Sequence, residues 1–257
     1  MKMYEEATVV SVKETAPLIF DMTVRAKSAK EAVPGQFAMI YPKNPSTLLP
    51  RPISICEKSD DELRFVFRIA GKGTKEFSEY KKGDTVRILA PLGNGYDINA
   101  LKGKKVIVTG GGIGIPPMLE LLKTLKANGI EALGVFGYRD SALFLKEDFE
   151  KYGKVYIATE DGSVGTKGNV LDAVKEHDLD FDAICACGPM PMLRAVKNFA
   201  GEKGKEAYIS LEERMACGVG ACLGCVCKTV RKDAHSHVNN ARVCTEGPVF
   251  DAREVEI

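Results

Sequence analysis

The sequence predicts a β + α/β chain of three parts: an N-terminal antiparallel β-barrel, a parallel-sheet α/β domain and a small cysteine-rich C-terminal domain. Three observations lead to this prediction. Residues 4–90 contain about six short stretches rich in β-branched and aromatic residues, separated by glycine, proline and charged turns. From residue 104 onward, strand-like and helix-like stretches alternate. The segment after Ser210 holds five of the eight cysteines. We place the three domains at residues 1–100, 101–210 and 211–257.

Composition narrows the class of protein. The chain has 257 residues, of which 28% are charged and 45% hydrophobic, and this is ordinary for a globular protein. The formal net charge of +1 gives no reason to expect nucleic acid or an anionic membrane as a partner. No apolar run is long enough to span a bilayer, and the N-terminus lacks the apolar stretch of a signal peptide. We therefore expect a cytoplasmic protein, in which crowded cysteines indicate a metal centre rather than disulfides.

The barrel contains a candidate phosphate-binding strand. Pro50 and Pro52 bracket Arg51 in LLPRPISI and favour an extended backbone, with Ser54 close by. An arginine on a stiff strand suits bidentate pairing with a phosphate, and a serine hydroxyl can bond a heterocycle nitrogen. An edge-strand arginine beside a core serine explains the pattern equally well.

A second segment, RIAGKGT, also indicates phosphate binding. Gly71 and Gly73 surround Lys72, and we expect Thr74 to cap a short helix over residues 74–80. A glycine-rich approach to a helix N-terminus is a ready anion site, although a simple strand-to-helix turn remains the alternative. The two segments in one barrel favour a phosphate-bearing cofactor.

The α/β domain is expected to bind a nucleotide at the carboxyl edge of its sheet. The alternation of strands and helices implies a parallel sheet, whose ligands bind where its strands end. Three loops fall there: TGGGIGIPP at 109–117, ATEDGSVGTKG at 158–168 and ACGPMPML at 186–193. Tight turns need glycine in any case, but three such loops at one edge favour a nucleotide site. The glycines of the first loop are Gly110, Gly111, Gly112 and Gly114, and the third loop contributes Cys187, Gly188 and Pro189.

The acidic residues of the second loop bear on cofactor choice. Glu160 and Asp161 disfavour a 2′-phosphate and so favour NAD over NADP, although Arg139 weakens that inference. No Walker-type GxxxxGK[ST] loop occurs.

The C-terminal domain carries the most specific motif. Cys217, Cys222 and Cys225 have the C-x4-C-x2-C spacing of plant-type [2Fe–2S] ferredoxins, which take a fourth cysteine from further along the chain. We choose Cys244 as the fourth ligand over Cys227, because Cys227 already lies at the start of an expected strand. Two strands, KTV and RVCTEGPVF, are expected to form a small sheet with the polar stretch between them as its turn.

A structural zinc site is the main rival to an iron–sulfur cluster. Zinc cysteines usually come in two short pairs, whereas three here share one glycine-rich loop. His235 and His237 could serve as ligands, as in Rieske centres, but we read them as surface residues. Cys56 and Cys185 lie in apolar strands and are expected in the core.

These motifs, in this order, resemble the ferredoxin–NADP reductase superfamily and, more narrowly, the electron-transfer subunits of type B dihydroorotate dehydrogenase. The similarity covers nearly the whole chain. It is strongest at RPISI, GKGT, APLGNGY, GGGIGIPPM and LEERMACGVGACLGCVC. The last motif is the most specific, because relatives in the superfamily place and space their cysteines differently.

The resemblance implies FAD in the barrel, one [2Fe–2S] cluster at the C-terminus and NAD at the sheet edge. It also implies an FMN-containing catalytic partner that oxidises dihydroorotate for pyrimidine biosynthesis, in a heterotetramer with two copies of each subunit. No side chain is assigned as catalytic. A stand-alone NAD(P)H:ferredoxin or sulfur oxidoreductase, and a non-enzymatic nucleotide-sensing or zinc-binding module, remain as alternatives. The resemblance implies that the FAD site comprises Arg51, Pro52, Ile53, Ser54, Arg68, Ile69, Ala70, Gly73 and Thr74, and the cluster ligands Cys217, Cys222, Cys225 and Cys244.

Overall fold

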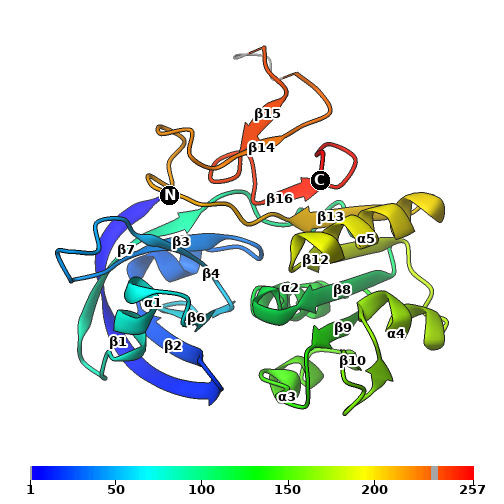
Figure 1. Cartoon of the computed structure of the whole chain (residues 1–257), viewed down its shortest axis with the longest axis horizontal. Helices are drawn as coiled ribbons and strands as arrows, with labels where there is room; N and C mark the ends of the chain where they lie inside the picture. Colours follow the sequence, from blue (N-terminus) through cyan, green and yellow to red (C-terminus); the bar gives the residue numbers. More distant parts are fainter. Residues whose placement is uncertain (1, 233–236) are drawn as a thin grey trace.

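The protein is described here by a computed structural model covering residues 2–232 and 237–257. Figure 1 shows the β-barrel at the left, the α/β domain at the right and a small lobe above the two. The predicted fold class is confirmed in all three parts. Within the described residues, no helix has the length and apolar character needed to cross a membrane.

The barrel is a coiled antiparallel sheet of seven strands in the order β4-β3-β7-β1-β2-β6-β5. Buried and exposed residues alternate along much of β1 and β7, as expected when one face of a sheet covers a core. The strands are β1 (Met3–Ala16), β2 (Ile19–Arg25), β3 (Phe37–Tyr41), β4 (Arg51–Ser54), β5 (Glu57–Lys58), β6 (Glu62–Arg68) and β7 (Thr85–Leu92), with a 3-10 helix at Lys27–Glu31 and helix α1 at Lys72–Ser78.

One continuous stretch joins the two ends of this sheet. Residues 51–58 form this stretch, and they are divided between β4 and β5. The first half pairs with β3 and the second half with β6. The chain changes partner at Ile55 and Cys56, where Cys56 N–H donates to Arg64 O at 2.8 Å. The barrel is closed by this change of partner, so β4 lies beside β6.

The α/β domain is built on a second seven-stranded sheet, in the order β11-β10-β9-β8-β12-β13-β16. All neighbours pair in parallel except β16, which is antiparallel to β13. The central strand β8 is buried along its whole length, the pattern of a parallel strand covered on both faces. The strands are β8 (Val106–Gly111), β9 (Ala132–Tyr138), β10 (Lys154–Thr159), β11 (Thr166–Lys167), β12 (Ala183–Cys187) and β13 (Glu206–Ser210); the helices are α2 (Met118–Ala127), α3 (Lys146–Glu150), α4 (Val170–Glu176) and α5 (Met190–Glu202), with a 3-10 helix at Gly112–Gly114.

The helices divide between the two faces of this sheet. Helices α2 and α3 pack on the face that also meets the barrel, in a core that includes barrel residues Cys56 and Val66. Helices α4 and α5 pack on the other face, in a core shared with Cys225, Cys244 and Phe250 of the C-terminal segment. The C-terminal segment therefore uses the core of its neighbour rather than building one of its own.

The C-terminal strands differ from the prediction. Strand β14 (Val226–Lys228) pairs with β15 (Asn240–Arg242) in the small sheet, but β16 (Val249–Asp251) joins the α/β sheet beside β13. The predicted single strand RVCTEGPVF is thus wrong, because a turn at 243–247 sends its two halves to different sheets. Strands β11 and β13 were not predicted.

Candidate functional site

The proposed flavin-site residues lie on two barrel strands, β4 and β6, that are in contact. Strand β4 pairs with β3, placing Met39 opposite Pro52 and Phe37 opposite Ser54. Residues 51–54 are half-buried, and residues 68–70 at the end of β6 are exposed or half-buried. Since β4 and β6 lie side by side, the two predicted segments come together at one partly open surface.

Gly73 allows the helix α1 to approach Arg51. A β-carbon on Gly73 would lie 2.9 Å from Arg51 Nε, so any side chain there would displace the guanidinium group. Arg51 Nη1 donates to Leu49 O at 2.6 Å, which leaves other N–H groups of the fork for a ligand. The cradle that this glycine leaves open fits the phosphate role expected of Arg51.

Thr74 acts differently from the expected N-cap. Helix α1 begins at Lys72, with Gly71 at the N-cap, so Thr74 lies within the first turn. Its Oγ1 accepts the N–H groups of Ala70 (2.9 Å) and Gly71 (3.2 Å). The hydroxyl reaches back from the third helical position, because a threonine there can satisfy N–H groups that precede the helix.

The first and third nucleotide loops touch each other at the carboxyl edge. Gly110 on β8 pairs with Cys187 on β12. A β-carbon on Gly114 would lie 2.5 Å from Cys187 O, and one on Gly111 would lie 2.6 Å from Met192 Sδ. Only glycine fits at Gly114, where the neighbouring atoms belong to the backbone, whereas at Gly111 the Met192 side chain would have to move. Gly112 is exposed and has a φ of +53° that glycine adopts readily. This tight glycine turn fits a dinucleotide at the topological switch point of the sheet.

Cys187 stays a thiol at this edge. Burial raises its pKa to about 12, outweighing a hydrogen bond with Ser210 that lowers it. It therefore provides a neutral surface beside Gly188 and Pro189 rather than a charged nucleophile.

The acidic loop lies further along the same edge. Strand β10 ends at Thr159, one strand beyond β9 from the glycine loop. Glu160 is exposed, and hydrogen bonds from Ser163 lower the pKa of Asp161. Two anionic side chains therefore stand at this end of the edge, in keeping with the expected preference for NAD.

Three of the cysteines lie on one irregular loop. Cys217 Sγ accepts the backbone N–H groups of Val219 and Cys222, both at 3.4 Å, and Cys222 Sγ accepts that of Gly224 at 3.5 Å. Burial raises the pKa of Cys217, but hydrogen bonds from these backbone N–H groups outweigh it and lower the pKa to about 6. The thiolate, which is the form that ligates metals, is therefore favoured at neutral pH.

Cys244 approaches this loop from the turn after β15. It is buried, and its thiol forms a hydrogen bond with the thiol of Cys225, which is also buried. Burial and the neighbouring Cys225 both raise the pKa of Cys244, while Gly220 N–H donates to it. The structure thus brings Cys244 to the three loop cysteines, so it fits the fourth ligand position.

Cys227 faces elsewhere. It lies in β14 opposite Ala241 and is half-buried, because this strand belongs to a two-stranded sheet. Burial raises the pKa of Cys227, outweighing a hydrogen bond from the Ala241 N–H that lowers it. His237 is exposed, and His235 lies outside the described residues.

Tertiary contacts of the cysteine loop were missed at the sequence level. Gly218, with a φ of +70°, packs on the barrel so closely that a β-carbon would lie 2.7 Å from Met39 Cγ and 3.1 Å from Leu92 Cδ1. Asn94 Nδ2 donates to Thr245 O at 3.0 Å, fixing the turn that carries Cys244. The APLGNGY motif, which contains Leu92 and Asn94, was the available signal, but it did not reveal these partners.

Comparison with known proteins gives matches across the chain. The family model "Iron-sulfur cluster binding domain of dihydroorotate dehydrogenase B" matches residues 212–256, and "Oxidoreductase NAD-binding domain" matches residues 108–198. A dihydroorotate dehydrogenase B (NAD(+)) electron transfer subunit from Lysinibacillus sphaericus is 41% identical over 96% of each chain. The subunit of the same name from Streptococcus mutans is 43% identical over 99% of each chain.

A solved structure is also similar over nearly the whole chain. It comes from the NADH-dependent reduced ferredoxin-NADP oxidoreductase, studied for flavin-based electron bifurcation. The two superpose with a TM-score of 0.87 and 28% identity, covering 97% of this chain and 89% of that one. The similarity includes the C-terminal segment as well as the barrel and the α/β domain.

Proposed function

This chain belongs to the family of dihydroorotate dehydrogenase B (NAD+) electron transfer subunits, and from this membership we propose that it passes electrons from a separate catalytic subunit to NAD+. The donor is the FMN of a subunit that oxidises dihydroorotate in the biosynthesis of UMP. The chain receives electrons at a [2Fe–2S] cluster and passes them on through FAD. It is the diaphorase subunit of the enzyme and has no dihydroorotate site of its own.

The cofactors supply the redox chemistry: a [2Fe–2S] cluster carries one electron, and FAD accepts single electrons and gives up a hydride. The chain binds and orients them. We assign FAD to the segments around Arg51 and Gly73, and NAD to the loops around Gly111 and Cys187. The cluster ligands are Cys217, Cys222, Cys225 and Cys244.

One observation supports this route above the others. The Cys217–Gly218 backbone packs directly on Met39 of β3, and Met39 pairs with Pro52 of β4 in the proposed flavin site. The cluster loop and the flavin strand are therefore separated by a single strand. The 3-10 helix at Gly112–Gly114, in the loop assigned to the nicotinamide cofactor, contacts β6 of the barrel.

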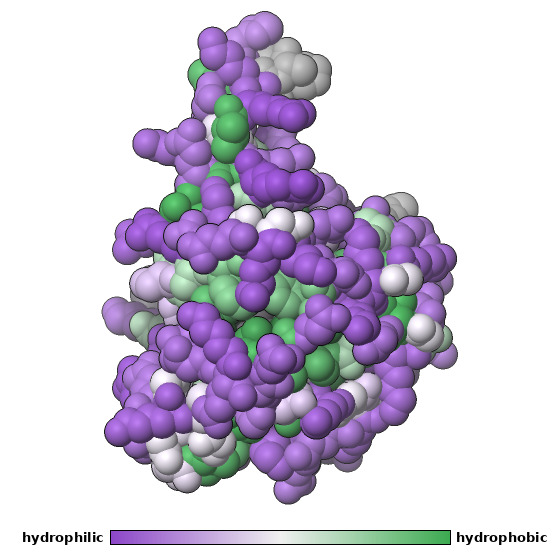
Figure 2. All heavy atoms as spheres, turned by 90° about the vertical axis from the view of Figure 1, so that its right-hand side faces the viewer, coloured by the Kyte–Doolittle hydropathy of each residue, from purple (hydrophilic) through white to green (hydrophobic). Residues whose placement is uncertain are grey.

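The outer side of the cysteine loop suits a partner protein. Val219 and Leu223 are 44% and 60% exposed beside the ligands. The lobe formed by β14 and β15 projects beyond the rest of the molecule, with apolar side chains among polar ones (Figure 2). We propose that this side docks the FMN subunit, in a cytoplasmic heterotetramer with two copies of each subunit.

Co-purification with the FMN subunit tests the proposal. The complex should contain FAD, FMN and about two irons per electron transfer subunit, and it should reduce NAD+ when dihydroorotate is added. Its native mass should equal two of each chain. A colourless protein that binds zinc would contradict the proposal.

Cys222→Ser separates the two halves of the route. The variant should lose dihydroorotate-dependent NAD+ reduction while NADH still reduces the FAD. Equal loss of both activities would indicate a structural cluster that carries no electrons.

A stand-alone NAD(P)H:ferredoxin or sulfur oxidoreductase is the second candidate. The similarity to the NADH-dependent reduced ferredoxin-NADP oxidoreductase favours it. Rapid NADH oxidation with a soluble ferredoxin or a sulfur compound, by the purified chain without any FMN subunit, would support this alternative.

A further inference from the structure

A group of charged side chains crosses the boundary between the barrel and the α/β domain. Arg64 on β6 is at its centre. Its guanidinium donates to Asp21 of the barrel at 2.8 Å and to Asp148 of α3 at 2.8 Å. It also donates to Glu57 on β5 at 3.1 Å. One arginine fork therefore ties two barrel strands to a helix of the other domain.

A second branch of the group runs from Glu57 to helix α2. Lys123 Nζ lies 3.3 Å from Glu57 Oε1 and 3.3 Å from Glu120 Oε2, and it donates to Lys58 O at 2.8 Å. Tyr152 OH also donates to Glu57, at 3.1 Å. We call Asp21, Glu57, Arg64, Glu120, Lys123 and Asp148 the interdomain ion cluster.

Two backbone hydrogen bonds cross the same boundary. Lys58 N–H donates to Glu120 Oε2 at 2.9 Å, and Glu120 N–H donates to Cys56 O at 3.0 Å. Glu120 lies in the first turn of α2, where N–H groups have no partner within the helix. The barrel segment that closes the sheet thus supplies the partner for the start of α2.

Because several of these charged side chains are buried, the arrangement favours one relative orientation of the two domains. The side chains of Asp21 and Glu120 are 3% and 5% exposed, and that of Arg64 is 18% exposed. A buried charge is costly unless its partners are placed with good geometry. A small rotation of one domain against the other would separate Arg64 from Asp148, and Lys123 from Glu57, together.

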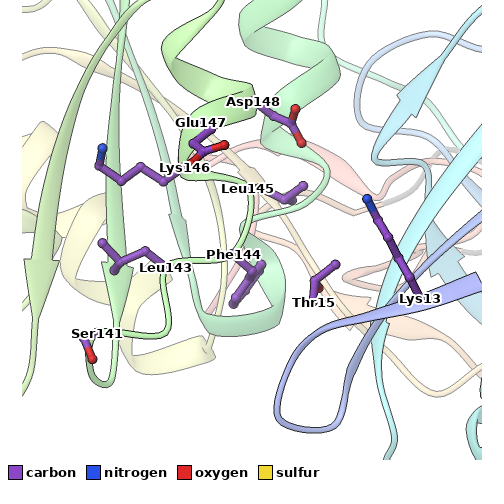
Figure 3. Close-up of a pocket in the computed structure, with 9 residues that line it drawn as sticks. All are labelled: Lys13, Thr15, Ser141, Leu143, Phe144, Leu145, Lys146, Glu147 and Asp148. Carbon is purple, nitrogen blue, oxygen red and sulfur yellow. The ribbon is translucent and has the colours of Figure 1, made fainter.

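The domains are less closely joined next to the cluster. A cleft of about 520 Å³ lies between Lys13 and Thr15 of the β1 hairpin and residues 141–148 of the α/β domain. Figure 3 shows the barrel residues on one wall and the residues leading into α3 on the other, with Asp148 at the rim. At this end of the boundary, the ion cluster connects α3 to the barrel beside the apolar core that contains Cys56, Val66 and Phe149.

We propose that the interdomain ion cluster is a clamp that fixes the angle between the two domains, and that Arg64, Lys123 and Asp148 are positioning residues for hydride transfer. The proposal rests on the proposed function, since that function puts FAD on the barrel and NAD on the α/β domain. The nicotinamide carbon and the flavin nitrogen that react would be held by different domains. Their separation would therefore depend on the angle between the domains. Misplacement by about 1 Å can slow such a step by roughly 100-fold.

Two variants test the clamp while leaving the Arg64–Asp21 pair of the barrel intact. These are Asp148→Asn, and Asp148→Asn combined with Lys123→Met. The control is Lys151→Met, because Lys151 is 62% exposed and its ion pair with Asp148 lies within the α/β domain. The first variant is close to isosteric and keeps the experiment informative if the double variant folds poorly.

Hydrogen exchange on the cofactor-free chain measures the clamp directly. The amides of Lys58 and Glu120 should exchange at least about tenfold faster in the double variant, and less so in Asp148→Asn, because their acceptors lie across the boundary. In both variants the amides of β8 should exchange at the wild-type rate. In Lys151→Met the amides of Lys58, Glu120 and β8 should all exchange at the wild-type rate. Unchanged exchange at Lys58 and Glu120 in both variants would overturn the clamp.

Rapid mixing of the FAD-loaded complex with NADH measures the effect of the clamp on hydride transfer. The rate of flavin reduction should fall about 10- to 100-fold in the double variant, with the dissociation constant of NADH within about twofold of the wild type. An unchanged rate despite faster amide exchange would refute the positioning role. If wild-type protein shows no flavin reduction by NADH, the proposed function fails, and the amide measurement still decides the clamp.

Discussion

The barrel meets its two neighbours through opposite kinds of contact. Toward the cysteine loop it presents Met39 and Leu92, which are fully buried, and the loop meets them with Gly218, which has no side chain. Toward the α/β domain it presents Arg64 and Glu57, which bond to charged groups on two helices beside the apolar contact of Cys56 and Val66. The first contact depends on shape, and the second depends on the directions of individual hydrogen bonds.

This difference indicates what each contact controls. Apolar packing places the cysteine loop against β3, so the distance between cluster and flavin is set by how closely backbone and side chains fit. In the charged contact every buried charge needs its partner, so few relative orientations of the two domains are possible. This contact therefore sets the angle between the barrel and the α/β domain. The two contacts should therefore respond differently to the same kind of substitution.

The largest expected effect is on the charged side. Arg64→Met leaves Asp21 buried without its main partner, which should lower the free energy of unfolding by about 3–5 kcal/mol. Arg25→Met is the control, because Arg25 pairs with Asp61 and Glu62 at the surface and should contribute at most about 1 kcal/mol. Urea unfolding of both variants measures the difference, and equal losses would contradict the contrast between buried and exposed pairs.

On the apolar side, Gly218→Ala tests shape alone. The new β-carbon would meet Met39 Cγ at 2.7 Å in a backbone conformation that side chains rarely adopt, so the loop must move away from β3. Dihydroorotate-dependent NAD+ reduction by the complex should fall about 10- to 100-fold, while reduction of FAD by NADH persists.

Gly224→Ala provides the matched control on the same loop. There the β-carbon would lie 3.5 Å from Cys222 Sγ, an ordinary contact, and activity should stay within about threefold of the wild type. Iron content measured on both variants separates loss of the cluster from its displacement. A Gly218→Ala complex with full iron and full activity would show that the close packing is dispensable.

Sequence patterns predicted the elements better than their partners. The glycine run after an apolar strand and the cysteine spacing are local signals, so the loops around Gly111 and Cys222 could be located in advance. The split of residues 51–58 between two partner strands could not, because barrel closure is decided by residues distant in the sequence. For the same reason, the placement of β16 in the α/β sheet was missed.

The candidate site shows the same limit. Its residues were named from motifs, but the packing of Gly218 on Met39 and the hydrogen bond from Asn94 to Thr245 O depend on tertiary contacts that no spacing encodes. Arg64 drew no notice because a lone arginine in an alternating strand ordinarily faces solvent. Only the fold brings Asp21 and Asp148 to it.

A pH titration examines the charged contact more finely. Burial raises the pKa of Asp148, but hydrogen bonds from Lys151 and Arg64 lower it by more, so the net pKa lies below the usual value. The carboxylate therefore stabilises the folded state above the unfolded pKa of about 3.9, and this contribution is lost as pH falls through the folded pKa. Asp148→Asn should cost about 1–2 kcal/mol at pH 7.

The gap in unfolding free energy between wild type and Asp148→Asn should then narrow as the pH falls below about 4. Urea unfolding at several pH values from 7 to 3 provides the measurement. A gap that stays constant over this range would mean that Asp148 contributes through its shape rather than its charge.

Conservative substitutions at Met39 and Arg64 should have the smallest effects on stability. They compare the apolar contact with the charged contact most directly. Met39→Leu keeps the volume against Gly218 and should cost less than about 1.5 kcal/mol, with electron transfer unchanged. Arg64→Lys keeps the charge but replaces a planar fork, which reaches Asp21, Glu57 and Asp148 from three different nitrogens, with a single ammonium nitrogen. It should therefore cost more stability than Met39→Leu in the same urea assay. If Met39→Leu proved the more harmful of the two, the position of the cysteine loop would depend on specific methionine contacts, and the contrast between shape and hydrogen-bond direction would be wrong.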